Sequence, residues 1–409
     1  MRRRLLAATL AVAAVVVAGA AALATGRDGE GEAVPPAGST QADPRTRFAV
    51  THVDEPVPPV VATESTYVLG DRLHRLGQPE PVRLSHRLQA SLLGQSAAIA
   101  VPSRDGRFLA YHAWEDDTPL LVLRDLRTGE EQVLARNAQT VAWGPAGQLA
   151  YFQAAAPRTG VRPYVGHVVV RETLDAPPRR WTARADAFEV RAWSGTRLLV
   201  SVRYCPACPD DGLDVGLYAL DGPGDPHPLP LADLSALSPD GRWAVGPYQE
   251  VPGQDSPSPY ARLVEVETGR VAHTLDVAQA VRDAGIPLLP GTGGFFEASW
   301  RGDEIVAHAA AAADGMLVFL RVVDEELVLE DVLRPERDAF DGRFGVALGR
   351  PTFAGPRTDR VVVSGAWESG GGEFRVAVLA CDRPTRTCTA GAPRDGTDWF
   401  ALVESPSRP

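Results

Sequence analysis

Aromatic side chains stand beside carboxylates at several points in this sequence, and that combination is able to bind a ligand. Exposed aromatic rings next to acids are typical of carbohydrate and peptide sites, although ordinary surface packing is the competing interpretation. The candidate ligand-binding residues are Trp114, Glu115, Asp116, Asp117, Asp210, Asp211, Tyr248, Glu250, Trp367 and Glu368.

Metal binding by these or other side chains has little support in their spacing. Carboxylates could bind Ca²⁺, which takes roughly six to eight oxygen ligands, but no stretch has the spacing of an EF-hand loop. The eight histidines are scattered, without the His-x-His or His-Glu-x-x-His spacing that would hold a transition metal. We therefore predict no metal and no cofactor, and interpret His112 and His308 as structural groups near strand ends.

The sequence also lacks the local signature of a hydrolase. No Gly-x-Ser-x-Gly nucleophile elbow occurs, which argues against a prolyl-peptidase-like enzyme. Paired-carboxylate glycosidase chemistry depends on the distance between two carboxyl groups, which a sequence does not show. We predict no catalytic residue and favour a protein that is not an enzyme.

Four cysteines allow three pairings, and we favour the two local ones. Cys381 and Cys388 flank a short segment that reads as a hairpin turn, so they can meet across it. Cys205 and Cys208 form the sequence Cys-Pro-Ala-Cys after a predicted strand. A structural disulfide that closes this loop is favoured over redox chemistry or metal binding. Two disulfides fit an oxidising compartment.

The N-terminus predicts export. Arg2–Arg4 precede an apolar run, Leu5–Ala24, which reads either as a cleaved signal peptide or as an uncleaved membrane anchor over residues 1–25. Residues 26–59 are rich in Gly, Pro and acids and predict a flexible spacer, and residues 406–409 a disordered tail. The formal net charge of −11 argues against a nucleic-acid partner and against membrane contact outside the N-terminal segment.

The elements that must position the candidate residues are short strands. The segment Ile99–Arg136 reads as four of them, over Ile99–Ser103, Phe108–Ala113, Leu120–Leu126 and Gln132–Leu134, with Trp114–Thr118 as a polar loop. Asp105-Gly106 and Thr128-Gly129 supply the positive φ that hairpin turns need. One such sheet leaves two apolar faces in water, so it needs copies of itself alongside.

The copies follow at intervals of about 40 to 60 residues, which suits four-stranded blades with insertions. Their first-turn glycines are Gly106, Gly147, Gly195, Gly241 and Gly302, and Pro356–Asp359 takes that place in the last copy. A further unit would combine strands within Thr66–Arg87 with Trp399–Glu404 as its inner strand. We therefore predict an all-β chain with a single β-propeller over residues 60–405. It would have seven four-stranded blades, or six as the alternative, and pairing of the N- and C-terminal strands would close it.

Three segments carry a resemblance to a known family. Ser238–Val245, Ser103–Tyr111 and Leu123–Gly129 resemble the repeat of TolB-type and WD-repeat-like β-propellers. The resemblance covers roughly Thr66 to Glu404 and implies the propeller fold. It implies no particular activity, because propellers host enzymes, receptors and scaffolds alike.

Loop lengths differ between the two faces of the predicted ring. Turns between the first and second and between the third and fourth strands are short, whereas the other connections are long and all lie on one face. In the long connection after Asp276, that residue is expected to cap a helix over Val277–Ala284, either a lid over the ring mouth or a cover for a sheet edge.

The predicted function is that of an exported, monomeric, non-enzymatic scaffold. It would be secreted or membrane-anchored, and would bind a protein or an envelope glycan through the long-loop face. The alternatives are a glycan hydrolase or lyase with its site at the ring mouth, or a purely structural module.

Overall fold

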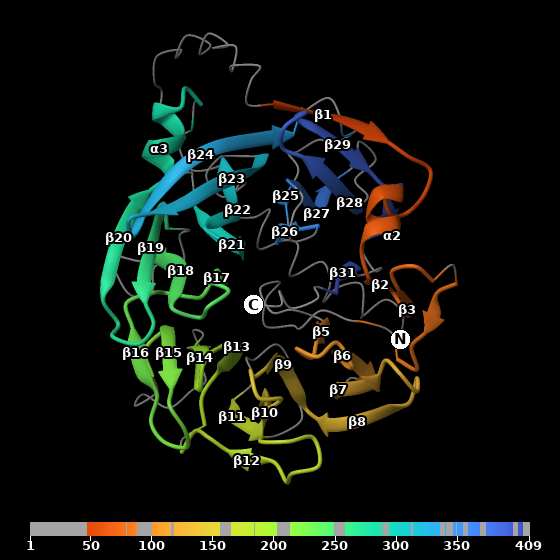
Figure 1. The fold of residues 1–409 in the computed structure, drawn as a ribbon, viewed down its shortest axis with the longest axis vertical. Helices are drawn as coiled ribbons and strands as arrows, with labels where there is room; N and C mark the ends of the chain where they lie inside the picture. Colours follow the sequence, from red (N-terminus) through yellow and green to blue (C-terminus); the bar gives the residue numbers. More distant parts are fainter. Residues whose placement is uncertain are drawn as a thin grey trace, which may run out of the picture.

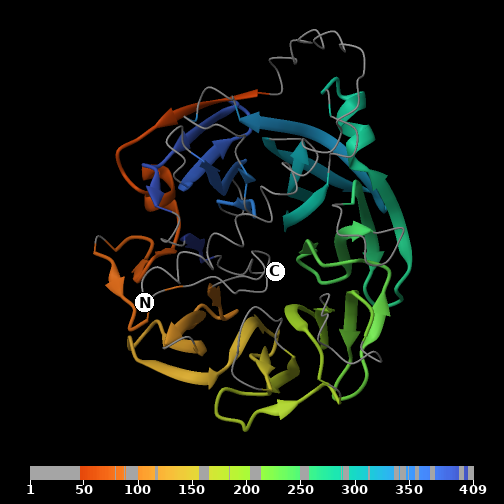
Figure 2. The same cartoon turned by 180° about the vertical axis from the view of Figure 1, so that it is seen from behind.

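More than half of the described chain is β-strand and very little is helix, and the strands are arranged mainly as sheets of four antiparallel strands. Figure 1 shows these sheets following one another around a common centre, and Figure 2 shows the same ring from behind. This is the architecture of a β-propeller, as the sequence predicts. The computed structural model describes residues 47–78, 80–86, 88, 100–115, 118–155, 165–183, 185–202, 213–248, 258–286, 288, 294–311, 314–335, 340, 347–348, 350–354, 359–368, 374–395 and 400–403.

Five sheets contain four strands each, which follow one another from the centre of the ring outward. The first contains β31 (Phe400–Leu402), β2 (Tyr67–Leu69), β3 (Arg72–His74) and β4 (Val82–Arg83). The second contains β5 (Ala100–Pro102), β6 (Phe108–Glu115), β7 (Thr118–Asp125) and β8 (Glu131–Arg136). The third contains β9 (Ala138–Trp143), β10 (Leu149–Ala154), β11 (Gly166–Arg171) and β12 (Arg179–Arg180). The fourth contains β13 (Phe188–Ser194), β14 (Arg197–Val202), β15 (Gly216–Leu220) and β16 (His227–Leu229). The fifth contains β17 (Ala236–Leu237), β18 (Trp243–Tyr248), β19 (Tyr260–Glu265) and β20 (Val271–Asp276).

The last sheet has 11 strands because β1 (Arg47–His52) joins two groups. One group contains β21 (Phe295–Arg301), β22 (Glu304–Ala311), β23 (Asp314–Val323) and β24 (Glu326–Pro335). The other contains β25 (Ala347–Leu348), β26 (Thr352–Phe353), β27 (Arg360–Glu368), β28 (Phe374–Asp382), β29 (Thr387–Ala390) and β30 (Arg394–Asp395).

The last described strand, β31, joins an early strand of the chain in the first sheet. β31 pairs antiparallel with β2, and Phe400 lies opposite Leu69. This is the pairing that the sequence predicts between Trp399–Glu404 and Thr66–Leu69.

The turn sequence Ser-x-Asp-Gly-Arg folds identically in two sheets. Asp105 accepts hydrogen bonds from the Ser103 hydroxyl at 2.6 Å and from the Arg107 N–H at 3.0 Å, while Gly106 takes a φ of 69°. The corresponding turn at Asp240 repeats these contacts with the same two distances. A carboxylate two residues before an N–H closes such a turn, and glycine avoids the Cβ clash at positive φ.

The core lies between neighbouring sheets. Phe152 and Val168 of one sheet, for example, pack in one cluster with Phe188 and Val200 of the next. Trp143 and Trp193 occupy the same register and donate from their indole nitrogens to carbonyls of the preceding sheet, at Val101 and Ala142. These two tryptophans therefore join neighbouring sheets.

Helix α3 (Val277–Asp283) has the N-cap that the sequence predicts. The Asp276 carboxylate accepts from the Gln279 N–H at 2.8 Å. Val277 and Val281 are buried in a cluster shared by the sheets on either side, and Figure 1 places the helix at the outer rim near β20 and β24. The helix therefore covers sheet edges and is not a lid over the centre.

Two sequence-based boundaries differ from the structure. Arg47–His52, within the predicted spacer, is strand β1, and Pro59–Glu64 is helix α2. Trp114 and Glu115 continue β6 and pair with Pro119 and Thr118, so the predicted loop there is a much shorter connection. The predicted signal or anchor over residues 1–25, spacer residues 26–46, the 406–409 tail and the Cys205–Cys208 pair lie outside the described residues.

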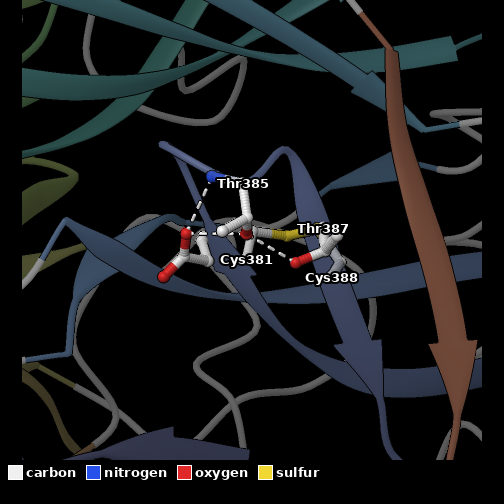
Figure 3. The surroundings of a disulfide bond; sticks show 5 residues. Cys381, Thr385, Thr387 and Cys388 are labelled. Atoms are coloured by element: carbon white, nitrogen blue, oxygen red, sulfur yellow. Dashed lines mark hydrogen bonds between the residues drawn. A yellow bond between two sulfur atoms is a disulfide. The ribbon is translucent and has the colours of Figure 1, made fainter.

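A disulfide joins Cys381 of β28 to Cys388 of β29, residues that lie directly opposite each other in the ladder. Figure 3 shows this disulfide beside the turn that connects the two strands. In that turn the Asp382 carboxylate accepts from the N–H of Thr385 at 3.0 Å and from its hydroxyl at 2.8 Å. The covalent bond and the turn together hold this hairpin in one register.

Candidate functional site

Three of the predicted ligand-binding positions lie at corresponding strand ends. Glu115, Tyr248 and Glu368 are the last residues of β6, β18 and β27, each the second strand from the centre of its sheet. The second strand of every sheet runs in the same direction relative to the axis of the ring. The C-terminal ends of these strands therefore belong to one face, which we call the long-connection face. The structure therefore brings residues from three separate sheets to one face of the ring, and their role in binding a ligand stays a prediction.

The side chains at the end of β6 already have neighbours within their own sheet. Trp114 is half-buried and lies opposite Pro119 on β7. Glu115 is exposed and accepts from the Arg136 guanidinium at 2.6 Å, with both side chains about half in solvent. An exposed ion pair of this kind contributes little to stability, so Glu115 can exchange Arg136 for a cationic group of a ligand at small cost.

Tyr248 is covered on one ring face. The Arg262 guanidinium lies 3.3 Å from the centre of the Tyr248 ring, a cation–π contact. Arg262 is itself held by the carbonyl of Pro230, which accepts a hydrogen bond at 3.2 Å. Tyr248 is thus a rigid, partly exposed aromatic at the start of a long connection.

The other predicted positions are less fully described. Asp116, Asp117, Asp210, Asp211 and Glu250 lie outside the described residues. Trp367 and Glu368 are placed by their backbones at the end of β27, opposite Arg375 and Phe374. Their role as ligand contacts stays a prediction.

A cavity of about 160 Å³ lies among the strands that face the centre of the ring in Figure 1. Its walls come from β9, β13, β17 and β21, and from the segment before β26. The lining residues are Val141, Val190, Arg191, Ala192, Leu234, Ser235, Ala236, Leu237, Glu297 and Arg350. The accessible lining of this cavity is more polar than apolar, and its volume is below the roughly 300 to 1,000 Å³ of typical small-molecule pockets.

A buried charged cluster forms one side of this cavity. The side chain of Arg191 is 3% exposed, and its guanidinium pairs with Asp233 and, at 3.2 Å, with Glu189. The Ser201 hydroxyl accepts from Arg191 Nε at 3.0 Å and donates to Asp233. Removing two carboxylates and a guanidinium from water is costly, and Arg191 partly offsets that cost.

The backbone near Asp233 explains how this cluster is positioned. A Cβ at Gly246 would lie 1.9 Å from the Asp233 carbonyl oxygen, so only glycine lets the segment before β17 approach β18 this closely. The Asp233 carboxylate also accepts from the Leu234 N–H at 2.7 Å. Asp233 is thereby fixed toward Arg191 from a neighbouring sheet.

The sequence does not predict this cluster, although a weak signal for it is present. Glu189 and Arg191 alternate within Phe188–Ser194, a strand whose other side chains are mostly apolar. Like-facing charges in a strand normally indicate a solvent-exposed face, and the partner Asp233 lies more than 40 residues away. A β-bulge between Val190 and Ala192 turns Arg191 toward the cavity.

His112 is buried and His308 is half-buried, and both lie within second strands of their sheets. Burial lowers the pKa of His112 to about 4 and that of His308 to about 4. Neither ring nitrogen of His112 has a hydrogen-bond partner, so this histidine is neutral core and not a hydrogen-bonded structural group.

Within the described ranges, no group of three or more His, Cys, Asp or Glu side chains could hold a metal ion. None of the helices in that part of the chain is long and apolar enough to span a membrane.

Comparisons with known proteins find likeness of fold only. No protein-family model matches the chain, and no curated protein matches its sequence. Among solved structures, TolB from Acinetobacter baumannii is similar at 13% identity and a TM-score of 0.39, over 83% of this chain and 63% of that one. The putative TolB from Agrobacterium tumefaciens is similar at 16% identity and a TM-score of 0.39, over 69% of this chain and 89% of that one. An oligogalacturonate lyase in complex with manganese is similar at 12% identity and a TM-score of 0.46, over 88% of this chain and 91% of that one. This chain thus spans less than two thirds of the first TolB, and the activities and partners of these proteins are not transferred to it.

Proposed function

We propose that this protein is an exported, non-catalytic β-propeller that binds a protein or an envelope glycan through its long-connection face. The 11-stranded sheet is interpreted as two blades joined by β1, which gives seven blades with the five separate sheets. Pairing of β31 with β2 closes the ring.

The observation that carries the proposal is the contrast between the two faces. At one face, the turns are short and tied by their own side chains, as at Asp105 and Asp240. At the other, second strands of three sheets end in aromatic and acidic residues. The connections that follow them vary in length, from two residues after Glu115 to eleven after Tyr248. A rigid scaffold that carries variable loops on one face is typical of a binding protein.

A photo-crosslinking experiment tests which face binds. A photoreactive amino acid is placed at Glu115 or Tyr248, and, as the matched control, at Arg104 in a short turn of the opposite face. We expect crosslinks to envelope protein or glycan from the first two positions and none from Arg104. Equal crosslinking from both faces would contradict the proposal.

An enzyme with its site at the central cavity is the second candidate. The cluster of Arg191, Asp233 and Glu189 favours it, because enzymes retain costly buried charges where they do chemistry. A glycan hydrolase or lyase would release new reducing ends from polysaccharide. Asp233→Asn should abolish that release while Glu115→Gln leaves it unchanged; no release by the natural chain would exclude this candidate.

A further inference from the structure

The N-terminal strand β1 borders the one disulfide of the described chain. Val50 of β1 lies opposite Cys388 in a parallel ladder. Both Cys381 and Cys388 are 1% exposed and belong to one apolar cluster with Phe48, which is fully buried. The neighbouring sheet supplies Phe319 and Leu333 to the same cluster. A thiol in solution therefore has no open route to either sulfur atom.

Among the elements that enclose the disulfide, β1 has mostly exposed side chains, and the N–H of Val53 just after it donates to the Ala390 carbonyl at 2.9 Å. Four of its six residues are exposed, and only Phe48 is fully buried. It pairs with β24 through two residues and with β29 through four. The other walls are strands of full antiparallel ladders, which open only with their whole sheets.

Arg386 connects β1 to the disulfide hairpin and to the neighbouring sheet. Its carbonyl accepts from the Ala49 N–H at 3.0 Å, and its guanidinium donates to the two Asp331 oxygens at 2.9 and 3.2 Å. Arg383, in the same turn, donates to Glu330 at 3.1 Å and stacks on the Phe319 ring at 4.6 Å. The turn that the disulfide closes thus holds both β1 and β24.

We propose that β1 is a releasable strap that gates reduction of the Cys381–Cys388 disulfide by a dithiol. With the strap docked, the sulfur atoms are enclosed. When the strap leaves, the Cys388 side of the hairpin becomes an open edge, and a thiolate can approach.

The reaction is thiol–disulfide exchange. A thiolate of the dithiol attacks one cysteine sulfur, the Cys381–Cys388 bond breaks, and the other cysteine leaves as a thiolate that takes a proton. The second thiol of the reductant then attacks the mixed disulfide and releases the remaining cysteine. Two electrons and two protons pass to the protein, and the dithiol becomes a disulfide.

Strap position and redox state are linked in both directions. Once the disulfide is open, the turn that carries Arg383 and Arg386 loses its covalent closure, so the Ala49 contact is less well positioned. Linkage is reciprocal at equilibrium. If reduction of the disulfide favours release of β1 by some factor, then release of β1 favours reduction of the disulfide by that same factor. Through β1, the N-terminal segment that precedes it is coupled to the oxidation state of the Cys381–Cys388 disulfide.

The test uses the full-length chain with Cys205→Ser and Cys208→Ser, so that one disulfide remains. Dithiothreitol serves as the dithiol, and maleimide labelling counts free thiols by mass. Phe48→Ala, which removes the strap's buried anchor, should raise the native-state reduction rate by about tenfold. Thr51→Ala, an exposed position on the same strand, is the matched control and should leave the rate unchanged.

A measurement on the chain without strap mutations keeps the proposal testable if Phe48→Ala does not fold. Amide exchange at Ala49 reports the open population of the strap, and the reduction rate should scale with it across denaturant concentrations. Equal reduction rates for the Phe48 and Thr51 variants would overturn the proposal. The proposal would also be overturned if the reduction rate followed global unfolding of the protein, or if it exceeded the rate at which exchange at Ala49 shows β1 to open.

Discussion

The Asp233 carbonyl oxygen lies where a side chain at Gly246 would begin, 1.9 Å from an ideal Cβ position. This contact joins the segment before β17 to the middle of β18 and sets the place of the Asp233 carboxylate. Gly246→Ala must therefore displace backbone, and we expect it to cost about 2 kcal/mol in the free energy of unfolding. Denaturant unfolding measures this loss.

The matched control for this substitution is Gly222→Ala. A Cβ at Gly222 meets nothing within 4 Å, so stability should change by less than about 0.5 kcal/mol. If both variants lose the same stability, the close approach at Gly246 does not determine the local structure.

Arg191 is expected to stabilise the fold far more than a surface arginine. Arg191→Met leaves the buried carboxylates of Glu189 and Asp233 without their shared guanidinium, at a cost of about 3 kcal/mol. Arg136→Met removes an exposed pair with Glu115 and should cost less than about 1 kcal/mol. Urea midpoints of the two variants give the comparison, and similar losses would show that the Arg191 cluster is not energetically special.

Hydrogen bonds within a turn and ion pairs between sheets differ in how well a sequence predicts them. Ser103–Arg107 and Asp276 were predictable because their hydrogen bonds are local, within a few residues of the carboxylate. The Arg191–Asp233 pair was not, since it joins two sheets, and a charged residue in a strand normally predicts exposure.

Strand β1 escaped prediction for a related reason. Arg47–His52 lies in a segment rich in Pro and Gly, and six residues with one buried side chain give almost no periodic signal. Its two partners, β24 and β29, come from the far end of the chain. Parallel pairing of that kind depends on tertiary structure, which local composition does not encode.

The Asp105 turn is expected to contribute modestly to stability. Hydrogen bonds from the Ser103 hydroxyl and the Arg107 N–H lower the pKa of Asp105, so the carboxylate form is favoured in the folded state. Asp105→Ala should cost about 1 kcal/mol because it leaves these donors without their acceptor. Arg104→Ala, in the same turn and exposed, is the control and should be close to neutral; thermal unfolding of both checks the difference.

His112 and His308 should make the protein sensitive to acid. Burial lowers the pKa of each to about 4, whereas an unfolded histidine titrates near 6.5. Above pH 6.5 both states bind no proton there, so stability is complete. As pH falls from 6.5 toward 4, the unfolded state takes up protons that the folded state does not, and each histidine lowers stability by about 1 kcal/mol per pH unit.

His112→Leu should flatten this slope, measured as the free energy of unfolding from pH 7 to pH 4, while the exposed His227→Leu should leave it unchanged. An unaltered slope in the His112 variant would mean that His112 takes up its proton in the folded protein as readily as in the unfolded chain.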